Sequence, residues 1–115
     1  MTKSDILRVP KAWGQEVVLV NNDLYCGKFL YFDKEAVSSL HLHEKKQETF
    51  ILLHGEARLE LEGSENVLEW MRPVTILPGQ EHKVTAITDA LILEISTPHS
   101  DDDVTRFTES TRGLV

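Results

Sequence analysis

The sequence predicts an all-β protein, built as a barrel or a sandwich of short strands. From about residue 17 to residue 97, short runs of β-branched, aromatic and aliphatic residues are separated by Asn, Asp, Gly and Pro. Turn-forming pairs such as Gly63-Ser64 and Pro78-Gly79 lie between these runs, so hairpins are the expected connections. Many short strands joined in this way are typical of a barrel or a sandwich.

The nine predicted strands differ in how their apolar residues are spaced. In the strand at residues 57–62 apolar residues alternate with charged ones, so one face of that strand is expected to contact water. The segments 50–53 and 91–93 are apolar on both faces, which predicts central strands packed between two layers. In chain order the strands are expected at residues 17–20, 24–32, 38–43, 49–53, 57–62, 67–71, 74–77, 82–86 and 91–96.

The length of 115 residues is that of one ordinary domain with a single hydrophobic core. We expect the barrel core at about residues 17–97 and a C-terminal extension at residues 98–115. After Pro98 the sequence becomes rich in Asp, Ser and Thr. This change favours a loop, one edge strand near residues 104–107 and a loose end.

Composition and charge argue against two classes of binding partner, nucleic acids and membranes. The formal net charge of -7 repels a phosphate backbone, and the 12 basic residues form no long cluster, so nucleic acid is not an expected partner. No apolar run approaches the roughly 20 residues of a membrane span, so a membrane is not expected either. Cys26 is alone and the N-terminus lacks a secretory signal, which favours a cytoplasmic protein. Trp13 and Trp70 are expected as core or interface anchors, which favours a homodimer.

Three histidines and one glutamate form a candidate metal site. His41 and His43 lie two positions apart on a predicted strand, so both side chains project from one face. Glu48 opens the next strand after a polar stretch, and His82 follows Pro78-Gly79 at the mouth of another hairpin. Such a set suits one divalent transition metal (Mn, Fe, Co, Ni, Cu or Zn), since Mg and Ca prefer oxygen ligands alone.

Two short motifs resemble those of the cupin superfamily. The first holds two histidines, a glutamate and a glycine at the intervals of that superfamily, and the second ends with a glycine and a histidine three positions apart. In this sequence the first motif is His41-x-His43-x4-Glu48-x6-Gly55, and the second ends in Ile76-Leu77-Pro78-Gly79-Gln80-Glu81-His82.

The resemblance implies a fold and a cofactor. In cupins the four matched side chains bind one metal ion inside a double-stranded β-helix, or jelly-roll, barrel and leave one or two coordination positions open. Glu35 and Met71 stand where the two motifs usually begin with glycine, and Ala86 replaces a terminal asparagine. None of the three is a ligand position, so the expected ligand set is complete.

Parts of the chain also resemble cupins of the mannose-6-phosphate isomerase and lyxose isomerase type, among them residues 39–43 and Trp13-Gly14. This resemblance implies a metal-dependent isomerase or epimerase whose small-molecule substrate is a sugar or sugar phosphate. The metal would acidify a C–H group beside a carbonyl, and a nearby base would move the proton. The candidates for that base are, in falling order, Glu94, His54 and Lys28.

The sequence allows two different environments for Lys28 and two for Glu94. Lys28 either snorkels from an apolar face or supplies a charge inside the pocket. Glu94 interrupts an apolar strand, so it either faces solvent or serves the site. Lys45-Lys46 is expected as a solvated loop, and His99 as an exposed residue.

Two further functions are compatible with the same ligands. One is an Fe(II)-dependent dioxygenase, in which the open coordination positions take oxygen and a chelating substrate. The other is a non-catalytic cupin that binds a metabolite, since the fold alone does not name a reaction.

Overall fold

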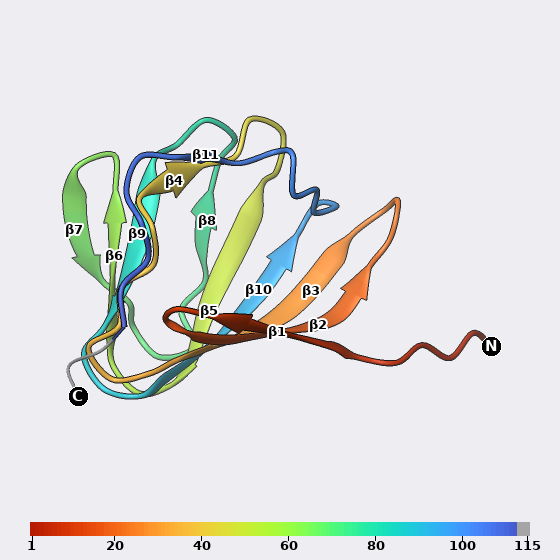
Figure 1. Cartoon of the computed structure of the whole chain (residues 1–115), viewed down its shortest axis with the longest axis horizontal. Coiled ribbons are helices and arrows are strands. Elements are labelled where there is room, and N and C mark those ends of the chain that lie inside the picture. Colours follow the sequence, from red (N-terminus) through yellow and green to blue (C-terminus); the bar gives the residue numbers. More distant parts are fainter. Residues whose placement is uncertain (113–115) are drawn as a thin grey trace.

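The computed structural model describes residues 1–112, which form eleven β-strands and no helix (Figure 1). Two antiparallel sheets face each other, which confirms the all-β, jelly-roll architecture expected from the sequence. One sheet has the order β1-β2-β3-β10-β5-β8 and the other the order β11-β4-β9-β6-β7. The strands are β1 (Leu7–Lys11), β2 (Gly14–Asn21), β3 (Cys26–Phe32), β4 (His41–Leu42), β5 (Glu48–His54), β6 (Ala57–Leu61), β7 (Ser64–Val67), β8 (Val74–Ile76), β9 (His82–Ala86), β10 (Ala90–Ser96) and β11 (Thr105–Arg106).

Strand β1 was not expected from the sequence and forms the edge of the six-stranded sheet, paired with β2. It contains Pro10, which weakens the strand signal in the sequence. At an edge a proline is tolerated, because the missing N–H group is not needed by a further strand. No helix in residues 1–112 is long and apolar enough to cross a membrane.

The predicted strand at residues 67–71 is wrong, because β7 occupies an earlier position. The turn before it explains the difference. Glu62 and Gly63 both have positive φ angles, 49° and 79°, and they close a tight hairpin in which Leu61 pairs with Ser64. The strand therefore begins directly after the turn and ends where the prediction begins.

The core lies between the two sheets and is built from the inward side chains of both. Trp13, expected as a core or interface anchor, belongs to the core and stacks on Phe32 with 4.2 Å between the ring centroids. Other members of this cluster are Leu30, Ala36, Phe50, Leu52, Ala57, Leu59, Leu68, Ile76, Val84, Ala86, Ala90 and Ile92. Trp70 is 72% exposed, and its indole N–H donates to the carbonyl oxygen of Leu53.

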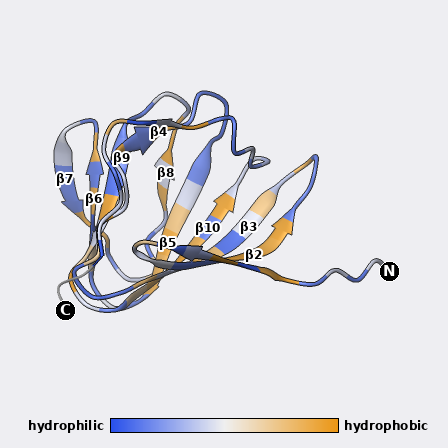
Figure 2. Ribbon diagram, viewed as in Figure 1, coloured by the Kyte–Doolittle hydropathy of each residue, from blue (hydrophilic) through white to orange (hydrophobic). Residues whose placement is uncertain are grey.

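The hydropathy of the residues changes along several strands of both sheets (Figure 2). On β6 the alternation expected for residues 57–62 is confirmed, because Ala57 and Leu59 are buried while Arg58 is exposed. Strands β5 and β10 occupy the interior of the six-stranded sheet, as expected, but residues 1–112 place a layer on their inner face only. The expectation of a layer on both faces is therefore wrong for the described chain.

Glu35 and Met71, which stand where cupin motifs usually have glycine, both adopt the left-handed backbone region. Their φ angles are 66° and 57°. Side chains with a Cβ atom disfavour this region, whereas glycine enters it freely. The two turns therefore keep a glycine conformation without a glycine.

The C-terminal extension runs back across the mouth of the barrel. Its edge strand is confirmed as β11, which pairs with β4. Asp103 lies just before this strand, and its carboxylate accepts the backbone N–H groups of Glu44, Lys45 and Lys46. The expected loose end is wrong as far as Thr111, which exchanges two backbone hydrogen bonds with Val37. Residues 113–115 of the predicted extension lie outside the described residues.

Candidate metal centre

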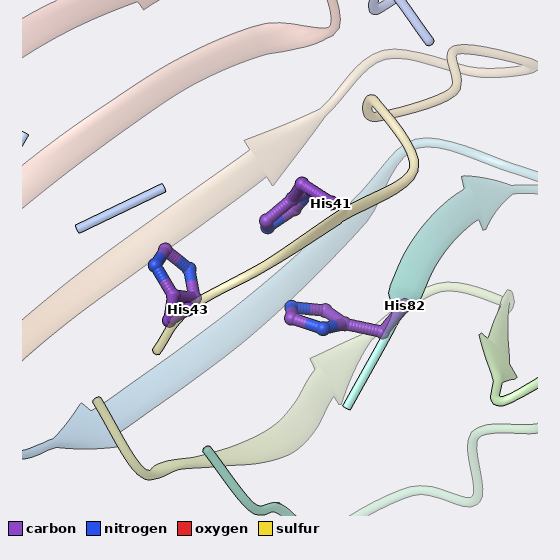
Figure 3. Close-up of side chains that lie close together, drawn as sticks. All are labelled: His41, His43 and His82. Carbon is purple, nitrogen blue, oxygen red and sulfur yellow. The ribbon is translucent and has the colours of Figure 1, made fainter. Parts of the chain in front are cut away.

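The three histidines of the predicted site come together inside the barrel. His41 on β4 pairs in register with His82 on β9, and His43 follows directly after β4. One ring nitrogen from each lies within 4.8 Å of the others. Figure 3 shows the three rings pointing toward a common point. His43 and His82 are buried, and His41 is partly buried.

Each imidazole is fixed by a hydrogen bond from its Nδ1 atom to a backbone carbonyl oxygen. The acceptors are Ser39 for His41 at 2.8 Å, Asp103 for His43 at 2.7 Å and Gln80 for His82 at 2.9 Å. Since a carbonyl oxygen only accepts, Nδ1 carries the proton in each ring. The Nε2 atoms are therefore the nitrogens that can bind a metal, with their orientation set by the backbone.

Burial keeps the first two imidazoles neutral at physiological pH. Desolvation, together with the neighbouring His82, lowers the pKa of His41 to about 4. Desolvation also lowers the pKa of His43, although the carboxylate of Glu48 opposes this shift. Neutral imidazoles with a free lone pair are the form that binds a metal.

Glu48 opens β5 and lies against the same cluster. Its Oε1 atom is 3.1 Å from Nε2 of His82, and its Oε2 atom is 3.5 Å from Nε2 of His43. Oε2 is buried without a hydrogen bond. Burial alone would raise the pKa of Glu48, but His82 and the ammonium of Lys46 lower it, so the carboxylate stays ionised.

This arrangement fits a bound metal ion. Because Nδ1 of His82 already donates to Gln80, the contact between Nε2 and Glu48 is favourable only when a second proton or a metal ion lies at Nε2. Oε2 of Glu48 accepts no hydrogen bond, although the ammonium of Lys46 lies 3.3 Å away, so it keeps a lone pair that a metal ion can take. Three imidazoles and one carboxylate are the donors expected for a divalent transition metal.

Lys46 is the main feature that the sequence interpretation missed. The expectation that Lys45-Lys46 forms a solvated loop is wrong for Lys46, whose side chain is 3% exposed. Its Nζ atom lies 3.3 Å from Oε2 of Glu48 and 3.0 Å from Oε2 of Glu94. The third neighbour is Nδ1 of His99 at 3.1 Å, so His99 is half-buried at the site rather than exposed as expected.

A cavity of about 870 Å³ connects this centre with the six-stranded sheet. Two of the three predicted base candidates line it, Lys28 and Glu94, which pair in register on β3 and β10. Both are buried. Lys28 forms an ion pair with Glu16 at 2.7 Å. Of the two environments expected for Lys28, the structure therefore has the one in which it supplies a charge inside the pocket.

His54, the third candidate for the base, is not brought to the site. It is exposed at the end of β5 and is not among the residues that line the cavity. The alternation of β5 places Glu48, Phe50 and Leu52 inward. His54 has the same parity, but it is the last residue of the strand, at the opposite end from Glu48, and is exposed there.

Glu94 is held by two neighbours on the same oxygen. The hydroxyl of Ser96 donates to Oε2 of Glu94 at 2.9 Å, and Lys46 contacts the same atom. Oε1 is therefore the oxygen that remains available to a ligand in the cavity. A buried carboxylate with one free oxygen, beside a cluster of three imidazoles, can accept a proton from a bound molecule.

No family model matches the sequence, and no curated protein is significantly similar to it. Several solved structures are similar in fold. KdgF from Halomonas sp. shares 23% identity at a TM-score of 0.75, over 86% of this chain and 90% of that one. PAC13 from Streptomyces, solved with uridine, shares 12% identity at a TM-score of 0.81, over 95% and 93%.

An RmlC-like cupin from Shewanella frigidimarina shares 19% identity at a TM-score of 0.75, over 87% of this chain and 88% of that one. These likenesses, together with the two facing sheets, show that the chain has the cupin fold.

Proposed function

We propose that the protein is a metal-dependent isomerase or epimerase of a sugar or sugar phosphate. The observation that carries the proposal is Glu94, a buried carboxylate that lines the same cavity as the three histidines. The proposed ligands of one divalent transition metal are His41, His43, His82 and Glu48. A cavity of about 870 Å³ lies within the range of small-molecule sites, roughly 300–1,000 Å³, and would hold a monosaccharide.

A divalent ion at this centre would polarise a carbonyl oxygen of the substrate and acidify the adjacent C–H group. In isomerisation, Oε1 of Glu94 would take that proton and return it to the former carbonyl carbon, while the adjacent hydroxyl group passes its proton to the former carbonyl oxygen. Epimerisation would require the enediolate to turn its other face to Glu94 before the proton is returned. Lys46 and Ser96 hold Oε2, so the base keeps one orientation through both transfers. Lys46 also lies beside Glu48 and so joins the base to a proposed ligand.

The pair of Lys28 and Glu16 supports a polyhydroxylated substrate. It offers N–H donors and carboxylate acceptors side by side in the cavity, without a net charge. Hydroxyl groups of a sugar both donate and accept, so this pair suits them.

For a phosphate group the cavity offers Arg106, which pairs in register with His41 and has no acidic partner within 4 Å among residues 1–112. Arg58 and Arg72, by contrast, are exposed and pair with Glu65 and Glu69. Neither lines the cavity.

The proposal is tested by following proton transfer rather than one product. The protein is loaded in turn with Mn, Fe(II), Co, Ni and Zn and incubated in D₂O with a panel of aldoses, ketoses and their phosphates. NMR then detects deuterium at the carbon beside the carbonyl. Glu94→Gln should abolish incorporation and leave the metal content unchanged, whereas His54→Gln should retain both.

Other outcomes would favour the two remaining functions. Oxygen consumption with Fe(II), without deuterium incorporation, would favour a dioxygenase. Binding of a panel member without incorporation under any metal would favour a non-catalytic cupin.

A further inference from the structure

Lys46 brings a positive charge into the centre that is proposed to hold a metal ion. Its Nζ atom lies 3.0 Å from Oε2 of Glu94, 3.1 Å from Nδ1 of His99 and 3.3 Å from Oε2 of Glu48. Only 3% of the side chain is exposed, so water screens this charge little. Ser96 already holds the same oxygen of Glu94, so orienting that base does not require a cation this close to Glu48.

The position of the ammonium is fixed from two sides. The backbone N–H group of Lys46 donates to the carboxylate of Asp103, which also accepts the two preceding N–H groups of the loop. His99, which contacts Nζ, is held by the side chain amide of Asn21, because this amide pairs with both backbone groups of His99 at 2.9 and 3.2 Å. These contacts involve no side chain of a proposed metal ligand, so they persist when an ion binds. The ammonium therefore stays at the centre in the loaded protein.

Glu48 does not need Lys46 to hold it in place. It opens β5, where it pairs in register with Ser96 of β10 on one side and with Ile76 of β8 on the other. Its carboxylate contacts His82 at 3.1 Å, and its side chain is only 2% exposed. Strand pairing on both sides thus sets the position of Glu48. An anchoring role does not account for the ammonium.

An ion and the ammonium would compete for the charge of one carboxylate. Oε1 of Glu48 lies beside Nε2 of His82 and Oε2 lies beside Nε2 of His43, two of the ring nitrogens that would bind the ion (Figure 3). Whichever oxygen the ion took, it would share the single negative charge of Glu48 with Lys46. Two positive charges at one buried carboxylate repel each other strongly, because the effective dielectric constant is far below that of water.

We propose that Lys46 is a positioning residue that weakens the hold of the centre on its metal ion. In the metal-free protein its ammonium takes the place of the ion beside Glu48. In the loaded protein it remains on Glu94 and His99 and repels the ion, which makes the ion exchangeable. This role of Lys46 presupposes the ligand set of the proposed function, but neither its reaction nor its substrate.

The experiment compares two variants that remove the charge of Lys46 with a matched control. Lys46→Met keeps most of the length of the side chain, and Lys46→Gln keeps a hydrogen-bond donor. Lys45→Met removes the same charge from the neighbouring, exposed side chain. Each protein is loaded with an ion that the wild type retains, among Mn, Fe(II), Co, Ni and Zn, and elemental analysis and circular dichroism verify loading and folding. Excess chelator is then added and the rate of ion release is followed. This measurement starts from the loaded state, in which the ion compensates the buried carboxylates.

Release of the ion is expected to be at least about tenfold slower from Lys46→Met and Lys46→Gln than from the wild type. In Lys45→Met the rate should be unchanged, because solvent screens an exposed charge. An anchor for Glu48 would have the opposite effect. Release at the wild-type rate or faster from either Lys46 variant, or failure of both to load, would therefore overturn the inference and leave the proposed function standing. A wild type that retains none of the five ions would overturn both together.

Discussion

Nζ of Lys46 and Oε2 of Glu94 lie 3.0 Å apart in a buried ion pair, with 3% and 5% of the two side chains exposed. Lys46 comes from the loop between β4 and β5, and Glu94 comes from β10. Burial alone would lower the pKa of Lys46, but Glu94 and Glu48 raise it, so the ammonium is charged at neutral pH. One cation therefore compensates two buried carboxylates.

Replacing Lys46 by Met should destabilise the metal-free protein by about 3–5 kcal/mol, because it leaves Glu48 and Glu94 buried without their cation. The free energy of unfolding is measured by urea titration at neutral pH in the presence of a chelator. Lys45→Met is the control, since the side chain of Lys45 is exposed. Its contact with the carboxylate of Asp103 is made by the backbone N–H group, which the substitution keeps. A change within about 0.5 kcal/mol is expected there. Equal stability of the two variants would contradict the prediction.

Replacing His82 by Ala should remove the metal and its contribution to stability. At a free metal concentration of about one hundred times the dissociation constant, that contribution is about 2.7 kcal/mol. Elemental analysis and thermal unfolding, with and without metal, measure both effects. His54→Ala is the matched control, because His54 is exposed and far from the cluster along β5. Metal retained at the wild-type level in His82→Ala would rule out this ligand.

Glycine at position 35 should stabilise the protein by about 0.5–1 kcal/mol. The φ angle of Glu35 is 66°, and the strain of a Cβ atom there outweighs the entropy that glycine adds to the unfolded chain. Met71→Gly should stabilise the protein for the same reason, because the φ angle of Met71 is 57°. Thermal unfolding compares each with Glu35→Ala, which keeps the Cβ atom and should bring no gain. Stabilisation by alanine as large as that by glycine would assign the effect to the lost side chain instead.

The metal-free protein should lose stability as the pH falls from about 6.5 toward about 4. Burial lowers the pKa of His41 to about 4, so between these values the unfolded chain binds a proton that the folded state does not. The contribution is complete above pH 6.5 and amounts to at most about 3 kcal/mol. Urea titrations with a chelator at several pH values measure the slope. His41→Gln should flatten it, and an unchanged slope would assign the pH dependence to other groups.

Much of the fold and of the site could be predicted from local patterns in the sequence. A spacing of two places His41 and His43 on one face of a strand, and the start of the next strand brings Glu48 close to them, whereas the face of Glu94 stayed open. Turn residues identify the hairpin at Pro78-Gly79 that carries His82. These features depend only on neighbours in the chain.

The features that escaped prediction depend on contacts between distant segments. Lys46 looks like an ordinary loop lysine until Glu94 and His99, about fifty residues later, enclose it. Glu16 and Lys28 meet only through the pairing of β2 with β3. β7 begins earlier than expected because of the turn at Glu62-Gly63. The left-handed conformation of Glu62 has no sequence signal, so this turn could not be predicted.

The backbone carbonyl of Asp103 fixes the ring of His43, sixty residues earlier in the chain, and the Asp103 side chain accepts three N–H groups of the loop that carries Lys46. During synthesis all four proposed ligands leave the ribosome before Asp103 does. A nascent chain that ends short of this residue thus holds the histidines without the contact that orients one of them. We therefore expect an ion at the proposed site to be held fully only after the segment around Asp103 has closed over the histidines.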